Sequence, residues 1–484
     1  MNSVGPSLVW FRNDRRISDN PALSAAIDRV APVVALYVLE LGGDGGRALG
    51  SAALWKLHGA LEALREALDK INVPLILKRG VSAEILPEVA GQIEAEACFW
   101  NRRYEPSAIA SDKKVMEILK ASKIDVRSWN GSLMVEPWQV KTKSGGWFKV
   151  FTPFCKAARA AGVDQSPIGV PSVALEWGDF PDLGDVLEDW GLIPKSPDWA
   201  GGLRANWGHG EEAARSRLSD FLIDGFRGYS EGRNFPAKSN VSGISPYLRF
   251  GEISPRQTRH AALIAADRAN GYLDSDFEVF ERELYWRDFS YNLLFHADEL
   301  PTSNFQAKFD KFPWRSDPND FDAWSKGKTG YPIVDAGMRQ LWETGWMHNR
   351  VRMIVASFLT KHLMIDWRQG ESWFWDTLID ADAASNPSNW QWVAGSGADA
   401  APYFRIFNPI SQGEKFDGSA AYVRRWVPEI ATLPNKFIHA PWMASAPELE
   451  EAGIQLGNTY PKPIVDHSAA RTRALSAYQS IRSE

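Results

Sequence analysis

Residues 8–39, LVWFRNDRRISDNPALSAAIDRVAPVVALYVL, hold two short apolar runs separated by a polar turn and a helical pattern. The runs Leu8–Phe11 and Val33–Leu39 are typical of strands that are buried on both faces of a parallel sheet. The same kind of run recurs at Val73–Leu77, Ala97–Trp100 and Val126–Trp129. Five strands separated by helices predict a doubly wound α/β domain with a five-stranded parallel sheet.

Helical patterns lie between the runs. In Ala52–Ile71, leucine and isoleucine recur at spacings of three and four residues, which forms one apolar stripe on a helix. The segments Ser82–Glu94 and Ser107–Ser122 are also expected to be helical.

The turn after the first strand, RNDRRISDN at residues 12–20, has neither the spaced glycines nor the lysine of phosphate-binding loops. This argues against a nicotinamide or nucleotide site at this turn. Any cofactor must be held elsewhere.

Composition divides the rest of the chain. Residues 171–199 carry four prolines and seven acids against one base, Lys195, which predicts an exposed linker. After about residue 205 the strand signals are scarce, and helical patterns occur at Glu211–Asp224, Ser254–Asn270, Glu278–Phe295, Pro332–Glu343, His348–Ile365 and Glu371–Ile379. We therefore expect an α/β domain over residues 1–130, a linker over 131–204 and an all-helical domain over 205–484.

Tryptophan is unusually frequent in this chain of 484 residues, with 22 Trp against 12 Tyr. Twelve of the tryptophans fall between Trp286 and Trp442, inside the helical half. This concentration suggests that the helical half uses aromatic rings for a function.

The net charge, the cysteine count and the lack of long apolar runs argue against several classes of protein. A net charge of −6 argues against a protein held on nucleic acid by its overall charge, although a local basic groove stays possible. The two cysteines, Cys98 and Cys155, are too few for a disulfide framework or a metal site, which suggests a reducing compartment. The N-terminus lacks a signal pattern and no apolar run approaches 18 residues. We expect a cytoplasmic protein with no metal and no membrane association.

The densest motifs lie between Thr329 and Pro409. They read TGYPIVDAGMRQL from residue 329, TGWMHNRVRMIVASFL from residue 344 and LIDADAASNPSNWQWVAGSGADAAPYFRIFNP from residue 378. Together with LVWFRNDRRISDNPAL at residue 8 and YVRRWVPEI at residue 422, they make the chain resemble the photolyase/cryptochrome flavoproteins. Within that family it is most similar to the microbial cyclobutane pyrimidine dimer photolyases.

The resemblance implies flavin adenine dinucleotide (FAD), folded into a U inside the helical domain. It assigns the phosphate and ribityl contacts to Tyr229, Ser242, Gly243, Ile244 and Ser245. Small residues suit this task because backbone N–H groups can approach a pyrophosphate closely. Many relatives have Thr and Arg where this chain has Val241 and Gly243, which removes potential phosphate contacts.

The resemblance also implies which residues tune the flavin ring. Arg352 would pair with Asp380 beside the isoalloxazine, Asp382 would contact its polar edge, and Asn386 would face N5. An amide can donate or accept a hydrogen bond there, which favours a repair enzyme that uses fully reduced flavin. The alternative for Arg352 and Asp380 is a buried charge pair that only braces the loop.

Three tryptophans, Trp390, Trp367 and Trp314, match the electron relay that leads from the flavin to the surface in this family. Indole is easily oxidised among side chains, so neighbouring rings can pass a hole outward and let light reduce the flavin again. Trp373 or Trp375 would supply a second branch. For any single tryptophan the alternative role is packing in an aromatic core.

Glu283 and Trp286, three residues apart, share one face of a helix. The resemblance places them in a cavity for a flipped-out dimer, together with Trp392, Asn349, Arg350 and Met353, with Arg233 at the DNA. A damaged base pair is cheap to extrude, and aromatic walls with a carboxyl group can then bind it. Glu283 would hydrogen-bond the pyrimidine edge; the alternative is a solvated carboxylate beside a helix contact. Photolyases for the (6–4) lesion carry histidines where this chain has Asn349 and Met353, which favours the cyclobutane dimer.

Basic residues predict a DNA surface, with a local excess at Arg227, Arg233, Lys238, Arg249, Arg256 and Arg259. Further bases follow at Arg350, Arg405, Lys415, Arg424 and Arg425. Interleaved aromatic rings and bases fit a groove that grips phosphates and stacks bases.

Family members often carry a second, antenna chromophore, frequently a folate. Relatives that bind folate in the interdomain crevice have an Asn-Glu pair after a Tyr-Glu motif. In NRRYEPSA, residues 101–108, Ser107 and Ala108 stand there. A folate at a shifted site, or another antenna, is therefore expected.

These features predict a monomeric flavoenzyme that repairs cyclobutane pyrimidine dimers in DNA with light, associated with the nucleoid when bound to DNA. The alternative is a cryptochrome, a blue-light photoreceptor on the same fold. The chain ends about 60 residues beyond Arg424 without a low-complexity extension, which favours the enzyme. A light-independent binding protein of this fold would leave Asn386 and the tryptophan set unexplained.

Overall fold

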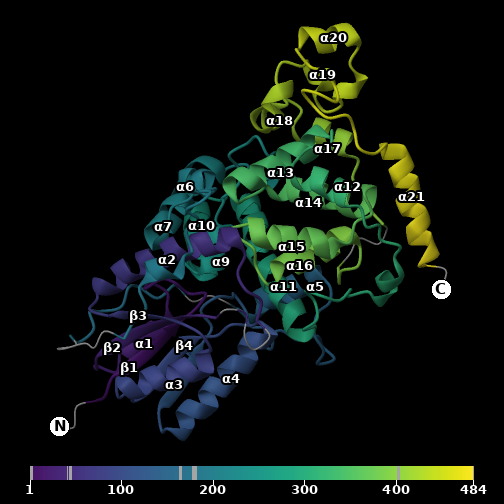
Figure 1. Ribbon diagram of the computed structural model, residues 1–484. Coiled ribbons are helices and arrows are strands. Elements are labelled where there is room, and N and C mark those ends of the chain that lie inside the picture. Colours follow the sequence, from purple (N-terminus) through teal and green to yellow (C-terminus); the bar gives the residue numbers. More distant parts are fainter. Residues whose placement is uncertain are drawn as a thin grey trace. The chain divides into compact units, whose positions relative to one another are not determined.

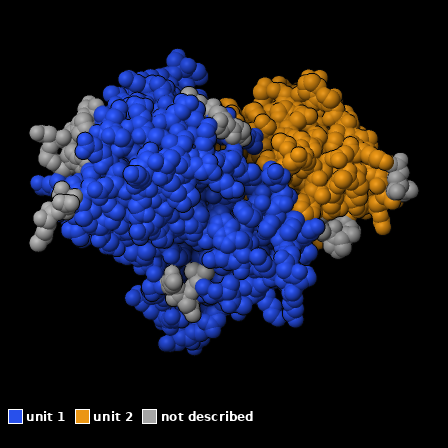
Figure 2. Space-filling model, turned by 90° about the horizontal axis from the view of Figure 1, so that it is seen from below, with its two compact units in different colours: residues 1–200, 207–223, 242–298 blue, residues 201–206, 224–241, 299–484 orange. Residues whose placement is uncertain are grey.

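The computed structural model describes residues 4–40, 42, 46–162, 166–176, 183–399 and 404–482. The chain forms two compact units, coloured separately in Figure 2. Unit 1 comprises residues 1–200, 207–223 and 242–298, and unit 2 comprises residues 201–206, 224–241 and 299–484. Both units are therefore built from separate stretches of sequence. The division into an α/β domain, a linker and a helical domain at residues 130 and 204 stays a prediction.

A five-stranded parallel sheet forms the centre of the N-terminal part of unit 1 (Figure 1). Its strands are β1 Ser7–Phe11, β2 Val33–Leu39, β3 Leu75–Arg79, β4 Ala97–Asn101 and β5 Asp125–Trp129. The spatial order is β3-β2-β1-β4-β5, and β1 pairs with β2 from Ser7↔Val33 onward. The predicted α/β fold class and all five strands are confirmed, with shifts of one or two residues at the ends.

Alternate residues of each strand face opposite sides of the sheet, and helices cover both sides. Leu8 and Trp10 of β1 pack with apolar residues of α3 (Ser82–Gln92) and α4 (Pro106–Ala121). Val9 and Phe11 pack with residues of α1 (Pro21–Ile27) and α2 (Ser51–Asp69). Because both faces are buried, the strands read as continuous apolar runs rather than as alternating ones.

The remaining helices of unit 1 are α5 Phe151–Ala161, η2 Leu187–Trp190, α7 Gly210–Asp220, α9 Ser245–Phe250, α10 Pro255–Arg268 and α11 Asp274–His296. A π-helical turn, η3 Phe221–Gly225, joins the two units along the chain. Unit 2 contains α6 Gly201–Asn206, α8 Tyr229–Gly232, η4 Ala307–Lys311, α12 Pro318–Ser325, α13 Pro332–Thr344, α14 Asn349–Ser357, η5 Phe358–His362, α15 Trp367–Thr377, α16 Ser385–Ala394, α17 Pro409–Phe416, α18 Ala421–Trp426, η6 Pro428–Ile430, α19 Asn435–Ile438, η7 Pro441–Met443, α20 Ala446–Glu451 and α21 His467–Ser480. The predicted helical character after residue 205 is confirmed.

Three helix predictions need correction. Two stretches predicted as single helices each end in a π-helical turn: Glu211–Asp224 is α7 followed by η3, and His348–Ile365 is α14 followed by η5. The helix expected to begin at Glu371 begins at Trp367, because the side chain of Asp366 accepts a hydrogen bond from the N–H of Arg368. Among the described helices, none combines the length and apolar character needed to cross a bilayer.

The predicted linker is less exposed than expected in its second half. Residues 177–182 lie outside the described residues. Leu187, Trp190 and Leu192 are buried against α2, β2 and β3 in one apolar cluster. The acidic composition of the linker gave no sign of this contact, because three apolar side chains change the average composition of a polar segment very little.

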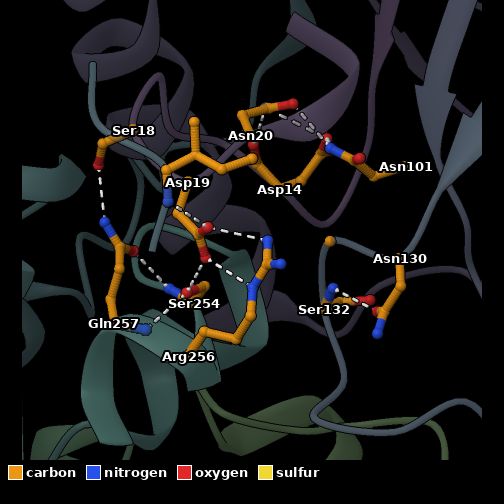
Figure 3. A network of polar contacts seen from close by, with 12 residues as sticks. Asp14, Ser18, Asp19, Asn20, Asn101, Asn130, Ser132, Ser254, Arg256 and Gln257 are labelled. Atoms are coloured by element: carbon orange, nitrogen blue, oxygen red, sulfur yellow. Dashed lines mark hydrogen bonds and ion pairs between the residues drawn. The ribbon is translucent and has the colours of Figure 1, made fainter. Parts of the chain in front are cut away.

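The polar turn after β1 is buried rather than exposed (Figure 3). Asp19, with a left-handed φ of +49°, forms an ion pair with Arg256 at 2.8 Å and accepts from the N–H of Ile168 at 3.0 Å. At the other end, Asn101 donates to Asp14 at 2.7 Å. The turn thus binds the end of β4 and the start of α10 with its own side chains, which agrees with the absence of a phosphate-binding loop.

Lys56 on α2 and Glu252 after α9 form a second buried polar contact in unit 1. Their charged atoms lie 2.7 Å apart, and neither side chain is exposed. Lys56 also donates to the carbonyl of Gly208 at 2.8 Å, and Glu252 accepts from the N–H of Gly210 at 2.6 Å. Burial lowers the pKa of Lys56 and raises the pKa of Glu252.

We expect Lys56→Met to lower the free energy of unfolding by about 3 kcal/mol or more, because Glu252 would be left buried without its cation. The double variant Lys56→Met/Glu252→Leu should recover most of this loss. Lys326→Met, which breaks an ion pair whose two side chains are both more than half exposed, serves as a control with an expected loss of about 1 kcal/mol or less. Urea denaturation measures all three, and equal losses for Lys56→Met and Lys326→Met would contradict the prediction.

Candidate functional site

The side chains expected at the flavin ring lie on α14, on α16 and on the loop between α15 and α16, all within unit 2. Arg352 and Asp380 form the predicted pair, with two parallel hydrogen bonds of 3.1 and 2.8 Å. The Nε of Arg352 donates in addition to the carbonyl of Met347 at 2.7 Å. The guanidinium is therefore fixed in one orientation by three hydrogen bonds.

Asp382 and Asn386 lie at the start of α16. Asp382 accepts from the N–H groups of Ala384 and Ser385 at 3.0 and 2.7 Å, so its carboxylate holds the first turn of the helix. The amide of Asn386 donates twice to Glu371 on α15, to the main-chain carbonyl at 3.0 Å and to the carboxylate at 2.8 Å. Sequence reasoning did not single out Glu371.

The three indoles expected to form a relay lie on α16, at the start of α15 and next to Arg315. Trp390 on α16 is buried and packs so closely on α15 that a Cβ on Gly370 would overlap its ring. Trp367, at the first position of α15, is fully buried and donates to Asn304 at 2.9 Å. Trp314 is half-buried and precedes Arg315, whose N–H donates to the carbonyl of Met364 just before α15. Trp314 is thus the most exposed of the three indoles.

A second pair of indoles reaches the surface in unit 2. Trp373 on α15 stacks with Trp342 on α13 at a ring separation of 6.0 Å and an interplanar angle of 11°. Trp342 is 64% exposed, whereas Trp375 is buried. Of the two candidates for a second branch, Trp373 therefore has a stacked and exposed partner. The sequence offered no signal for Trp342, because pairing across two helices depends on the tertiary fold.

In unit 1, Glu283 and Trp286 both lie on α11 and are half-buried. One face of Trp286 is covered by Phe151 of α5, with ring centroids 3.6 Å apart and an interplanar angle of 7°. Phe289 meets Trp286 edge-on at 5.9 Å. Two rings therefore fix the plane of this indole. Phe151 was missed because it falls in the predicted linker.

A cluster of cations and aromatic rings surrounds Arg350 in unit 2. Arg350 donates to Asn234, lies 3.9 Å from the sulfur of Met353 and lies over the ring of Phe416 at 4.4 Å. Burial, followed by the charges of Arg233 and Arg405, lowers the pKa of Arg350. Three guanidinium groups close enough to repel one another make a site that favours an anion.

Asn349 and Trp392 are the other two residues of unit 2 that were predicted at the lesion. Asn349 is exposed at the start of α14. Trp392 lines a small pocket with Phe404, Arg405, Phe407 and Tyr478 among its other walls.

The segment expected at the cofactor phosphates, residues 242–245, has a cation beside it within unit 1. Gly243 has a φ of +59°, and a Cβ there would lie 2.5 Å from the Nη2 atom of Arg217 on α7. Arg217 also donates to the carbonyl of Ser242 at 3.1 Å. The arginine missing at position 243 is thus replaced in space by one from another helix, which no local sequence pattern could reveal. Tyr229, the remaining member of the predicted set, is buried in unit 2.

Three of the predicted DNA-surface bases are engaged inside unit 1. Arg249 is buried and contacts Asn13, Arg256 pairs with Asp19, and Arg259 pairs with Glu281 at 2.6 Å. The prediction of an exposed basic surface is wrong for these three residues, because their charge is used to bind elements of unit 1 together.

Asp288 is the most deeply buried of the three buried acids of α11 and lies two residues from Trp286. It accepts from the N–H of Val135 at 2.8 Å. Burial raises its pKa to about 7 and outweighs the main-chain hydrogen bonds and the charge of Arg287. The helix that carries the predicted lesion contacts is therefore anchored by a carboxyl group that titrates near neutrality.

The structure gathers Arg352, Asp380, Asp382, Asn386 and the indoles in unit 2 around α14–α16. Glu283 and Trp286 on α11, and residues 242–245, belong to unit 1. Within the described ranges, no three histidine, cysteine or acidic side chains are grouped as a metal site. Both cysteines are free and buried.

Comparison with known proteins matches both halves of the chain. Residues 7–172 match the family described as DNA photolyase, and residues 280–480 match the FAD binding domain of DNA photolyase. The chain is 49% identical over 479 residues to the deoxyribodipyrimidine photo-lyase of Agrobacterium fabrum. The match covers 99% of this chain and 98% of that protein. It is 36% identical over 490 residues to Cryptochrome-1 of Arabidopsis thaliana, covering 99% of this chain and 71% of that protein.

Among solved structures, the chain is similar to a bacterial class III photolyase from Agrobacterium tumefaciens. The TM-score is 0.95 and the identity 48%, with 100% of this chain and 99% of that chain covered.

We predict that Asp288→Asn removes a pH dependence of stability. Because the pKa of Asp288 is raised from 3.8 to about 7 in the folded state, folding takes up a proton between these values, and stability falls as the pH rises through this window. The amide oxygen introduced by the substitution can still accept from the N–H of Val135, so the variant should gain stability relative to the parent as pH rises from 5 to about 8. Thermal unfolding midpoints across this range measure the difference, with exposed Asp376→Asn as control. A difference that stays constant with pH would contradict the prediction.

Proposed function

The chain belongs to the DNA photolyase family, and we propose that it uses light to repair cyclobutane pyrimidine dimers in DNA. The observation that carries this proposal is the set of Asn386, Arg352–Asp380 and Trp390 on α14, on α16 and on the loop before α16. The full-length relationship to a protein named deoxyribodipyrimidine photo-lyase supports it. The resemblance to the photolyase/cryptochrome family inferred from the motifs is thereby confirmed.

FAD is the cofactor, as the match to the FAD binding domain of DNA photolyase indicates. The residues fit this group. No described residue donates to the Oδ1 atom of Asn386, and Gly243 leaves the room beside Arg217 that a Cβ would fill. The residues that would hold FAD are Tyr229, Ser242, Gly243, Ile244, Ser245, Arg352, Asp380, Asp382 and Asn386, with Arg217 added as a phosphate contact.

When bound and reduced, FAD supplies the electron that opens the cyclobutane ring after absorption of light. The protein's part is to hold the lesion. Trp286, with one face covered by Phe151, offers its other face as a flat apolar wall, and Trp392 would be the second wall. Glu283 would hydrogen-bond the pyrimidine edge. Asn349 and Met353 would complete the cavity.

The cations of unit 2 would grip the strand on either side of the lesion. Burial, and after it the charges of Arg233 and Arg405, lower the pKa of Arg350. A phosphate between them would relieve this repulsion, so binding is expected to select backbone and lesion rather than base sequence. The enzyme would act on damaged DNA as a monomer.

A cryptochrome-type photoreceptor is the second candidate, because Cryptochrome-1 matches 99% of this chain over 71% of its own length. Asn386 favours repair, since relatives with an acid or a cysteine at this place tend toward signalling. The relay tryptophans Trp390, Trp367 and Trp314 would serve a repair enzyme and a photoreceptor equally, so they do not discriminate between the two functions.

An antenna chromophore, with a folate favoured, would add light-harvesting to this function. Ser107 and Ala108 depart from the crevice motif, so the folate would occupy a shifted site. An absorption band of the purified protein between those of the flavin would reveal it.

The repair assay uses an oligonucleotide with one defined cyclobutane dimer, irradiated with the reduced protein. We expect intact thymines to be restored by the parent, and the repair rate to fall about 10-fold or more in Trp286→Ala, because the loss of one stacking wall costs about 1–3 kcal/mol per base. Trp138→Ala, a partly exposed indole of unit 1 outside the proposed cavity, is the control. Absence of repair by the parent in light would refute the proposed function.

The relay predicts that Trp390→Phe abolishes the reduction of oxidised flavin by blue light in the presence of a thiol, because phenylalanine is far harder to oxidise than indole. Trp314→Phe should slow the photoreduction only partly if the stacked pair Trp373 and Trp342 provides a second electron route to the surface. Flavin absorbance during illumination measures both. Trp426→Phe, a buried indole of unit 2, is the control, and undiminished photoreduction in Trp390→Phe would show the assignment to be wrong.

A further inference from the structure

The ring of Phe404 in unit 2 is covered by two side chains from distant parts of the sequence. Tyr478 of α21, the yellow helix near the C-terminus in Figure 1, stacks on it with ring centroids 4.4 Å apart and an interplanar angle of 5°. The Nζ atom of Lys361 lies 3.4 Å from the centroid of the same ring. Both lie too close to this centroid to share one face of the ring, so they cover opposite faces.

Lys361 belongs to η5 and is 1% exposed. Its amino group also donates to the carbonyl of Ala394 at the end of α16. Burial lowers the pKa of Lys361 well below its ordinary value. An amine and an ammonium both carry N–H bonds that can point to a carbonyl oxygen and to an aromatic face. Lys361 therefore links η5, α16 and Phe404 in either protonation state.

The chain is held a second time three residues after Phe404. The N–H of Phe407 donates to the side chain of Ser357, the last residue of α14, at 3.2 Å. Ile406 packs against the apolar cluster that contains Phe404. Arg405 lies between these two attachment points and is exposed. The backbone that carries this guanidinium is therefore fixed on both sides.

We propose that Tyr478 and Lys361 are positioning residues that hold Phe404 and thereby place Arg405 to bind a phosphate of the DNA strand. This rests on the proposed function, in which Arg405 grips DNA together with Arg350. The C-terminal helix α21 thus takes part in substrate binding through Tyr478. Both positioning residues act through Phe404.

Fixing Arg405 in advance favours binding for two reasons. An arginine on a loose segment must be ordered when it binds, and that ordering weakens the complex. Arg405 also lies close enough to Arg350 for its charge, after burial, to lower the pKa of that residue. Holding two guanidinium groups near each other is unfavourable until an anion comes between them, so a fixed Arg405 favours the phosphate backbone.

The first test measures the affinity of the FAD-loaded protein for a duplex with one cyclobutane dimer, in the dark and at several salt concentrations. Tyr478→Ala removes the stacked ring, whereas Tyr478→Phe keeps it. Lys361→Met removes the N–H donor but keeps a side chain of similar length. Arg405→Gln is the reference for the loss of one phosphate contact.

Two matched controls separate the proposed contacts from general effects. Leu475→Ala shortens another side chain of α21 that packs against the same apolar cluster. Lys436→Met removes an amino group that lies 4.3 Å from the ring centroid of Phe437, in an exposed part of unit 2. Neither residue touches Phe404 in the proposal, so both variants should keep the affinity and the salt dependence of the parent.

Each phosphate contact contributes about 0.9 to the slope of log K against log salt concentration. We expect Arg405→Gln to reduce the magnitude of this slope by about 1 and the affinity by about 10-fold. Tyr478→Ala and Lys361→Met should reduce both quantities as well, and Tyr478→Phe should equal the parent. A slope in Tyr478→Ala equal to that of the parent would overturn the proposal, as would an equal reduction in Leu475→Ala.

A second measurement needs no DNA and covers the case in which Lys361→Met does not fold. Trypsin cleaves after arginine, so cleavage after Arg405 reports how often the segment around it opens. Tyr478→Ala should be cleaved there about 5-fold faster than the parent, because the stacked pair of rings is lost. Tyr478→Phe should be cleaved at the parent rate. Equal cleavage of Tyr478→Ala and the parent would overturn the proposal.

The two measurements also distinguish this proposal from the proposed function. Failure of the parent to bind or repair dimers would refute the proposed function. The cleavage rates after Arg405 would still show whether Tyr478 holds this segment, because they are measured on the protein alone.

Discussion

The turn at residues 12–20 is the constraint on which unit 1 depends. Its charged side chains are buried, so each one must find a partner within the protein. Asp19 finds Arg256 and the N–H of Ile168, Asp14 finds Asn101, and Arg16 donates to the carbonyl of Gly251. These partners come from three distant stretches of sequence, so burying one short polar turn determines which later segments must return to the sheet.

The parts of the molecule that sequence could predict are those governed by local periodicity. The strands Ser7–Phe11 and Val33–Leu39 were recognisable as apolar runs, and the pair Arg352–Asp380 followed from the motifs. Partners supplied by other elements were not recognisable. Phe151, which stacks on Trp286, comes from another helix, and this packing leaves no pattern in the sequence around Trp286. Arg217 also comes from another helix. It approaches Gly243 because that glycine is left-handed and has no Cβ, which the sequence around residue 243 does not reveal.

The contact between α15 and α16 fixes two side chains at once. Gly370 permits the close approach of Trp390, and its neighbour Glu371 holds Asn386. Any shift of one helix along the other would therefore alter both the packing of Trp390 and the hydrogen bonds of Asn386. The two helices must keep one register for both reasons.

The discontinuous composition of unit 1 has a consequence for how the protein is made. The sheet is complete once residue 129 has been synthesised, but Arg256, the partner of Asp19, is added more than a hundred residues later. During translation the nascent N-terminal part therefore carries Asp19 without its cation, and it cannot reach its final stability until the stretch 242–298 leaves the ribosome. A chain cut at residue 200 would remain in that unfinished state.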